Sequence, residues 1–363
     1  MDQNFDQLDI VENSESVMWK RCFAQPGSFE IYTVASSKYV DLLQMNRYVI
    51  RHDDDMIGVI EKINMQQDDD GRDMMLVSGR CAKALFARRI IFPQCTFSGT
   101  VWNRMYWMLS NHAINPPQPD RQIPNMTIAY VDTPFRGPAA QTQHTGTNLM
   151  TAVCDLLSSN NLGWKVTQDG TQFIITMFEG TDRTIDQEAI APVIFSDEFD
   201  NLVSSNYERD LTGYANVAHI AGEGDGDARI WDAIDATGTQ SGRYTGLNRY
   251  ELYVDARDIE KTTTDDAGND VNLTDAQYST ALRARGLEKL AEIKPESFEG
   301  DVDVGAYTYR VDYNVGDLVT IRDRHGITAN TRIESIEECE DKDGLTITPT
   351  FSDFTITNLE EAT

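Results

Sequence analysis

The sequence predicts a mainly β protein with an inserted α/β segment, an α+β fold. Three observations lead to this prediction. Short runs of β-branched and aromatic residues, broken by Asp and Gly turns, occupy both ends of the chain. Two amphipathic helical patterns lie between them, and a third helix is signalled near Thr274. With 363 residues, 40% of them hydrophobic, the chain can form about two to four packed domains.

The N-terminal region carries the first β pattern. Residues 1–16 are polar, and we expect a flexible N-terminus there. Residues 17–99 are predicted to form a first small β-barrel, because its strands are short and punctuated by turns such as Asp68–Gly71. The best-marked strands span residues 48–51, 59–63 and 74–77.

The middle of the chain predicts an inserted α/β domain over residues 100–190. Thr100 is a plausible N-cap for a first helix, and a second amphipathic helix opens at Thr147. A proline-rich excursion, residues 115–145, separates these two helices. A hairpin follows, with its turn at Asp169-Gly170.

The second half returns to β structure. Residues 191–260 are expected to contribute β segments that complete the barrels, and residues 261–299 form a helical segment. Thr274 and Gln277 have the spacing of a capping box at the start of that helix. Residues 300–363 are predicted to form the second β-barrel.

Two stretches share one order of elements. Residues 48–77 and 318–349 each run strand, turn, strand, acidic turn, strand. Their identity is low, so duplication and chance order both stay open. If the duplication is genuine, a closed trimer of such chains would present six barrels as a pseudo-sixfold ring.

Charge and targeting signals exclude several classes of function. The formal net charge of −28 opposes binding to nucleic acid or anionic lipid. The acidic N-terminus is not a signal peptide, and no run of about 18 apolar residues predicts a membrane anchor. The five cysteines are scattered without a C-x-x-C pair, which indicates reduced thiols in a cytoplasm.

The sequence contains only incomplete matches to catalytic and cofactor motifs. Gly222–Gly226 is rich in glycine, but its third glycine falls one position early for a dinucleotide fingerprint. The clusters Asp53–Asp55 and Asp68–Gly71 lack the calcium-loop pattern, so we interpret them as solvated turns. Loose calcium binding between subunits is the alternative. The five histidines show no ligand spacing. We therefore expect no catalytic, cofactor or metal site and no enzymatic activity.

Two charged groups are candidate interface residues. The main basic patch could meet an acidic neighbour in the ring, although an ordinary exposed helix face is the favoured interpretation. The acidic glycine-rich loop is the second candidate. Together these residues are Arg80, Lys83, Arg88, Arg89, Glu223, Asp225 and Asp227.

Several stretches, taken in order, resemble a family of siphophage minor structural proteins from the tail tip of phages that infect Gram-positive bacteria. The resemblance runs from about residue 18 to 355, and the motifs are specific as an ordered set. They are Val34–Tyr39, Asp41–Gln44, Glu179–Arg183, Pro192–Ser196, Phe199–Leu202, Gly222–Gly224, Tyr253–Ile259, Glu296–Gly300, Val315–Val319 and Pro349–Ser352.

The resemblance implies a non-catalytic tail-hub protein. Such hubs are homotrimers in which two tail-hub β-barrels per chain adapt threefold symmetry to a hexameric tail tube. The implied partners are further copies of the chain, a hexameric distal tail or tail tube protein, the tape-measure protein and receptor-binding proteins. The implied locations are the virion tail tip and, during assembly, the host cytoplasm. Roles in host attachment and DNA ejection would follow, with DNA passing through the ring without specific binding.

Two alternative functions stay open. One is a tail-tip module that binds carbohydrate or a receptor through the aromatic residues Trp102, Tyr106 and Trp107, although their helical spacing favours core packing. The other is a cell-wall hydrolase, since 59 acidic residues make accidental carboxylate pairs unavoidable.

Overall fold

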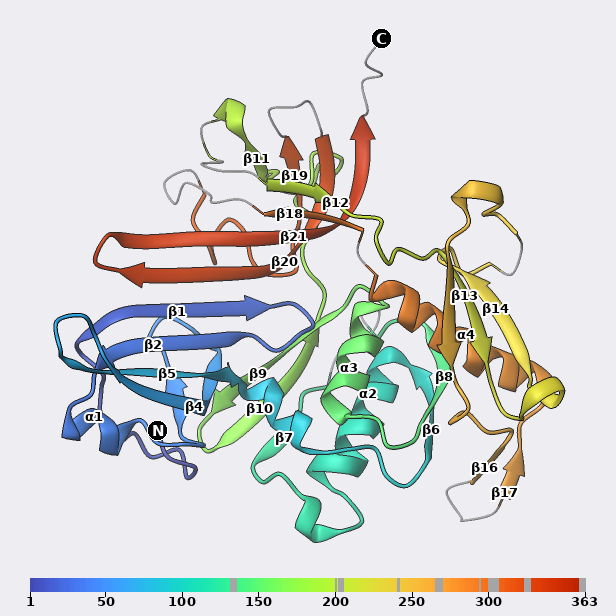
Figure 1. Ribbon diagram of the computed structural model, residues 1–363, viewed down its shortest axis with the longest axis horizontal. Helices are drawn as coiled ribbons and strands as arrows, with labels where there is room; N and C mark the ends of the chain where they lie inside the picture. The colour runs from blue at the N-terminus through green and yellow to red at the C-terminus, as the bar shows by residue number, and fades with distance from the viewer. Residues whose placement is uncertain are drawn as a thin grey trace. The chain divides into compact units, whose positions relative to one another are not determined.

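The computed structural model divides the chain into two compact units, which are described separately below (Figure 1). Unit 1 comprises Met1–Ala84, Gly163–Arg209 and Glu296–Thr363, and unit 2 comprises Leu85–Leu162 and Asp210–Pro295. The domain boundaries expected from the sequence remain predictions. The structure describes residues 1–130, 136–199, 201, 206–239, 242–264, 270–293, 295–299, 307–322 and 328–358.

The N-terminal segment of unit 1 is an antiparallel set of strands in the order β1-β2-β5-β4-β3. The predicted strands are confirmed, and the acidic turn joins β4 to β5. In that turn the Asp68 carboxylate accepts the backbone N–H of Asp70 and Arg72, and Gly71 takes a φ of +76°. The elements are β1 (Ser14–Cys22), β2 (Ser28–Val34), α1 (Ser37–Leu42), β3 (Tyr48–Ile50), β4 (Ile57–Gln67) and β5 (Asp73–Cys81).

Residues of the expected flexible N-terminus make contacts within unit 1. The amino group of Met1 donates a hydrogen bond to the Tyr48 carbonyl at 2.8 Å. The Phe5 ring lies 5.7 Å from the ring of Tyr48 and 4.9 Å from that of Phe173. These contacts hold the start of the chain against the unit, which the polar sequence did not indicate.

The C-terminal strands of unit 1 join the same sheet. Strand β1 pairs with β2 along one edge and with β20 along the other, so both ends of the chain form one 11-stranded sheet (Figure 1). The remaining strands of this sheet are β11 (Ile194–Ser196), β12 (Asn206–Arg209), β18 (Glu296–Glu299), β19 (Leu318–Arg322), β20 (Thr328–Asp341) and β21 (Gly344–Asn358).

The two separate barrels expected from the sequence are not confirmed. No sheet closes on itself among the described strands, since the path of the 11-stranded sheet runs from β12 to β3 and these two end strands do not pair with each other. Strand β1 joins the N-terminal and C-terminal sets into this one sheet. The repeated order of elements does form two antiparallel meanders, β3-β4-β5 and β19-β20-β21. They connect differently to the rest of the sheet, since β5 pairs with β2 whereas β20 pairs with β1. Duplication therefore stays a hypothesis.

The middle segment of unit 1 contributes the predicted hairpin. Strands β9 (Gly163–Asp169) and β10 (Gln172–Phe178) pair around the Asp169-Gly170 turn, which confirms its position. Alternate side chains along both strands are buried, including Trp164, Phe173 and Ile175.

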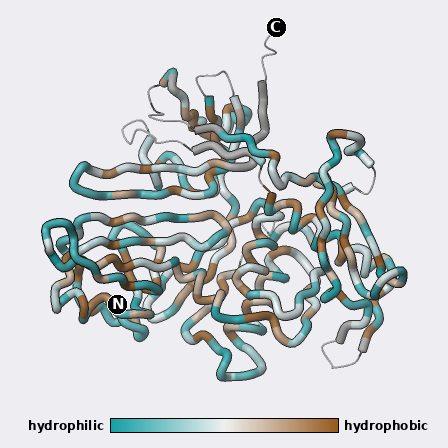
Figure 2. Tube along the Cα trace, in the orientation of Figure 1, coloured by the Kyte–Doolittle hydropathy of each residue, from teal (hydrophilic) through white to brown (hydrophobic). Residues whose placement is uncertain are grey.

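Two apolar clusters form the core of unit 1. One lies on the N-terminal strands around Trp19, Phe29 and Val77. The other gathers around Phe195 of β11, Tyr313 and Phe351 of β21. Figure 2 shows hydrophobic residues alternating with hydrophilic ones along strands of this sheet, as expected when one face of each strand is buried.

Unit 2 contains the three longer helices and smaller sheets. The predicted caps hold: the Thr100 side chain accepts the N–H of Asn103, and Thr274 and Gln277 form the capping box. The second helix is capped by Asn148, one residue after the expected start. The main elements are β6 (Cys95–Thr100), α2 (Val101–Leu109), β7 (Met126–Ile128), β8 (Ala139–His144), α3 (Leu149–Ser158), β13 (Val217–Ala221), β14 (Trp231–Asp235), β15 (Glu251–Asp255), β16 (Thr262–Thr264), β17 (Asp270–Asn272) and α4 (Asp275–Ala291).

A three-stranded sheet in unit 2 packs one face on α4. Its order is β14-β13-β15, with β13 antiparallel to β14 and parallel to β15. Ile220, Ile234 and Val254 form a cluster with Tyr278 and Leu282 of the helix, which lies beside these strands in Figure 1. Because side chains alternate along a strand, the neighbouring positions point to the opposite face.

Candidate functional site

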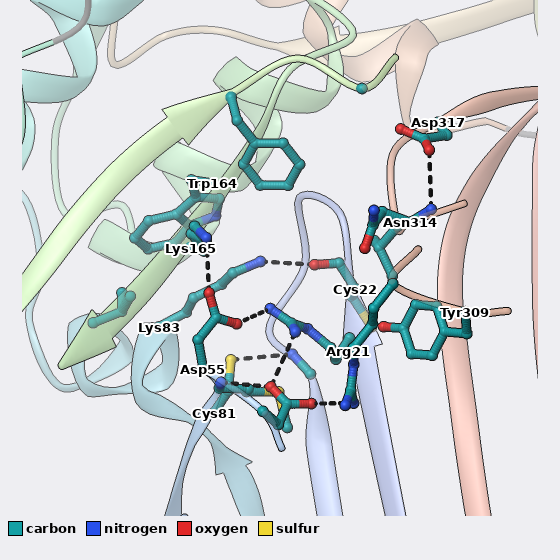
Figure 3. A pocket seen from close by; sticks show the side chains of 18 of the residues that line it. Arg21, Cys22, Asp55, Cys81, Lys83, Trp164, Lys165, Tyr309, Asn314 and Asp317 are labelled. Atoms are coloured by element: carbon teal, nitrogen blue, oxygen red, sulfur yellow. Dashed lines mark hydrogen bonds and ion pairs between the residues drawn. The ribbon is translucent and has the colours of Figure 1, made fainter. Parts of the chain in front are cut away.

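A pocket of about 550 Å³ lies within unit 1. All three segments of unit 1 line it: Arg21 and Asp55 come from the first, Trp164 and Lys165 from the second, and Tyr309 from the third (Figure 3). The pocket therefore exists only when segments far apart in sequence are folded together.

Asp54 is the most buried charge of this pocket. Its side chain is 0% exposed, and its two oxygens accept four hydrogen bonds. The donors are the Trp19 indole N–H at 3.0 Å, Arg21 at 3.0 Å, Arg310 at 2.6 Å and the Met56 backbone N–H at 2.6 Å. The interpretation of Asp53–Asp55 as a solvated turn is thus wrong for Asp54, because two arginines and a tryptophan replace its water.

Arg310 links the loop between β3 and β4 to strand β20. Its guanidinium donates to Asp53 and Asp54 and, at 2.6 Å, to the Glu338 carboxylate. Arg51 reaches the same Glu338 at 3.2 Å. Burial raises the pKa of Glu338, and the two arginines oppose that shift. Burial by itself would lower the pKa of Arg310, but the carboxylates of Asp54 and Glu338 raise it overall.

A second ion-pair chain runs across the pocket. The Asp55 carboxylate accepts hydrogen bonds from Arg21 at 2.5 Å and from Lys165 at 2.7 Å, as the dashed lines in Figure 3 show. On another wall, Asp317 accepts from Arg183 at 2.8 Å and from the Thr181 backbone N–H at 2.8 Å. These pairs connect each segment of unit 1 to another, so the site stabilises a fold built from separate pieces of chain.

The predicted interface residues Arg80 and Lys83 lie in unit 1 in different environments. Arg80 makes a bidentate ion pair with Glu61, at 2.7 and 2.9 Å. Lys83 is only 4% exposed, and its ammonium donates to the carbonyls of Cys22, Phe23 and Gln25 at 2.9 to 3.1 Å. In the folded chain Lys83 therefore fixes the loop after β1 through these three hydrogen bonds.

The predicted interface residues Arg88 and Arg89 lie in unit 2. Arg88 is exposed, whereas the half-buried Arg89 donates from Nε to the Arg121 carbonyl at 2.6 Å. Arg89 thus holds a neighbouring loop of the same unit, and Arg88 is the more accessible of the two.

The acidic candidates Glu223, Asp225 and Asp227 lie together on an exposed loop of unit 2 between β13 and β14. The Glu223 carboxylate accepts the Lys261 backbone N–H at 2.9 Å, which ties one side of the loop. The Asp225 side chain is 98% exposed and lies 3.5 Å from Arg229. The loop thus presents two carboxylates to solvent.

The aromatic residues of α2 lie beside its buried face. Val101, Met105 and Met108 are buried, while Trp102 and Tyr106 are half-buried and stack with ring centroids 5.2 Å apart. Trp107 is exposed. Helical spacing favours core packing for all three aromatic residues, and the structure places them around the edge of that core.

The arrangement is suited to holding chain segments and surfaces together. The pocket's carboxylates Asp54, Asp55 and Asp317 are each engaged by arginine or lysine, which neutralises them as ion pairs. Within the described ranges, no group of three or more His, Cys, Asp or Glu side chains could hold a metal ion. No helix in the described part of the chain is long and apolar enough to cross a membrane.

The fold is that of phage tail proteins. The chain is similar to a tail protein from Neisseria meningitidis MC58, with 16% identity and a TM-score of 0.57, over 94% of this chain and 92% of that one. A 43 kDa tail protein of prophage MuSo2 from Shewanella oneidensis matches at 13% identity and TM-score 0.58, over 94% and 95%. Prophage tail protein gp18 from Listeria monocytogenes EGD-e matches at 12% and 0.50, over 95% and 90%.

The sequence defines the family. Residues 1–353 match the model of the siphovirus ReqiPepy6 Gp37-like protein family, and the chain belongs to that family. No curated protein matches the chain in sequence at a significant level. The siphophage tail family that the ordered motifs indicated is thereby confirmed.

Proposed function

We propose that this chain is a structural hub subunit of a siphophage tail tip, which forms a homotrimeric ring that closes or extends the tail tube. The observation that carries the proposal is the tail-protein fold, which this chain shares with solved tail proteins over nine-tenths of both chains. Such a subunit acts by binding its neighbours in the tail, and in this proposal it has no reaction centre. The two tail-hub barrels would arise from the 11-stranded sheet as neighbouring copies complete it.

The proposed ring has electrostatic consequences. Each copy adds a net charge of −28, so an acidic bore would repel DNA and let it pass without sticking. Further partners would be a hexameric distal tail or tail tube protein, the tape-measure protein and receptor-binding proteins. Assembly would take place in the host cytoplasm before the chain is built into the virion, where the ring would serve host attachment and DNA ejection.

Two measurements test the proposal together. Native mass spectrometry of the purified chain is expected to give a trimer, and cryo-electron microscopy of intact tails should place a threefold ring at the tip. Antibodies against the chain, with antibodies against a capsid protein as the control, should label only the tail tip. A chain that is monomeric in solution and lies outside the tail tip contradicts the hub assignment.

A further inference from the structure

An aromatic pair stands out on the sheet face of unit 2 that α4 does not cover. Trp231 at the start of β14 is 55% exposed, and Tyr253 in the middle of β15 is 57% exposed. Their ring centroids are 6.0 Å apart at an angle of 60°. Large aromatic side chains expose considerable apolar area when left in water, so such a pair calls for an explanation.

The strand register explains how the two rings meet. Ala221 of the central strand β13 lies opposite both Trp231 of β14 and Asp255 of β15, and His219 lies opposite Tyr253. The small side chain of Ala221 leaves room above β13, and the rings of the two outer strands lean toward each other there. The tilt between them makes a corner that can receive a side chain.

Polar groups hold the aromatic pair and surround it. Arg229 donates to the Tyr253 hydroxyl at 3.3 Å and to the Gly224 carbonyl at 3.1 Å, and it lies 3.5 Å from Asp225. The Tyr253 ring is thus fixed to the acidic loop before any partner arrives. Trp, Tyr and Arg are the residues most enriched at the energetic centres of protein interfaces.

The charge around the face selects the kind of partner. Glu251 and Asp255, on the same face, are paired with Arg249 and Arg257 respectively. Asp225 and Asp227 project from the adjoining loop into solvent, so the rim carries negative charge. A second copy that docked through this same face would bring Asp225 and Asp227 against their own counterparts, and these like charges disfavour that pairing.

We propose that the outer face of the β14-β13-β15 sheet, centred on Trp231 and Tyr253 and bordered by Asp225 and Asp227, docks a different tail protein. That partner presents an apolar side chain to the aromatic corner and lysine or arginine side chains to the acidic rim. The inference rests on the proposed function, because it names the surface through which the tail subunit recruits its neighbour.

Site-specific photo-crosslinking in assembled tails tests this docking surface. Benzoylphenylalanine replaces Tyr253, and in a matched control it replaces Trp107, an exposed aromatic residue elsewhere in unit 2. Position 253 should crosslink to one other tail protein, through a segment that contains lysine or arginine, and position 107 should not. Adding Trp231→Ala should lower that crosslink yield about tenfold or more, whereas the double change Asp225→Asn with Asp227→Asn should lower it most at low salt.

The outcomes separate the two proposals. If the chain is missing from tail tips, the proposed function fails. If the chain is present but position 253 crosslinks to another copy, to no protein, or no better than position 107, the docking surface is refuted and the tail assignment stands. Retention on a glycan array together with absence of a protein crosslink would likewise refute it in favour of a carbohydrate site.

Discussion

Replacing Asp54 by Asn tests whether the pocket stabilises unit 1. In the native chain one oxygen of Asp54 accepts Arg21 and the Met56 N–H, and the other accepts the Trp19 indole and Arg310. An asparagine can keep the first pair, but its NH₂ group must then face two donors. Trp19 is 0% exposed, so its N–H loses its acceptor without gaining water, at a cost of about 1–3 kcal/mol.

The lost charge adds to that cost. Arg21 and Arg310 each lose a buried counter-ion. Both guanidinium groups still contact other carboxylates, and their side chains are 20% and 22% exposed to solvent. Breaking a buried ion pair by removing one partner typically costs about 3–5 kcal/mol. Because the remaining carboxylates and the partial exposure of both arginines reduce the cost of the lost charge to about 2 kcal/mol, we expect Asp54→Asn to lower the free energy of unfolding by about 3–5 kcal/mol in total.

Urea denaturation followed by intrinsic tryptophan fluorescence measures this change. The control is Asp53→Asn, because Asp53 also contacts Arg51 and Arg310 but its side chain is 57% exposed. That variant should lose no more than about 1 kcal/mol. An Asp54→Asn chain that unfolds at the wild-type midpoint, with an unchanged dependence on urea, would refute the assigned role of Asp54.

Two further predictions concern other buried charges. Lys83→Met should destabilise the chain by about 3 kcal/mol because it removes a cation bound to three carbonyls, while Arg88→Met should change stability by less than about 0.5 kcal/mol in the same urea assay. A stable Lys83→Met chain that fails only in assembly would contradict this. Burial raises the pKa of Glu288 to about 7 from 4.5, so its stabilising contribution is present below pH 4.5 and is lost as the pH rises through 7. Glutamine is neutral at every pH, so wild type should be less stable than Glu288→Gln near pH 7 and above. That deficit in free energy of unfolding, measured by urea titration, should shrink by up to about 1.4 kcal/mol per pH unit as the pH falls from 7 to 4.5. A constant difference would show that Glu288 is already ionised in the folded chain.

Local signals in the sequence predicted local structure well. The caps at Thr100 and Thr274 and the hairpin at Asp169-Gly170 depend on residues within a few positions of one another, and all three form as expected. The ordered motifs likewise indicated the family, since they needed no contact to be recognised. Where the hydrogen-bond partner is near in sequence, composition and spacing carry the information.

The pocket and the aromatic face could not be predicted in the same way. Asp54 meets Arg310 across 256 positions of sequence, and Trp231 meets Tyr253 through two strand registers. The triplet Asp53–Asp55 has the composition of a solvated turn, and nothing in its spacing shows that arginines will cover its middle member. Lys83 likewise has the sequence neighbours of an exposed basic patch, but the loop after β1, which is distant in sequence, buries it.

The sequence by itself determined the mainly β class, the positions of helices and turns, the acidic character and the family. Only the tertiary structure decided that β1 would pair with both β2 and β20, which joined the expected barrels into one open sheet. The physical reason is that caps and turns form between residues a few positions apart, so their formation costs little chain entropy and the residues responsible stand together in the sequence. The pairing of strands more than three hundred residues apart depends on how the whole unit closes, and it buries charges such as Asp54 that local sequence presents as exposed.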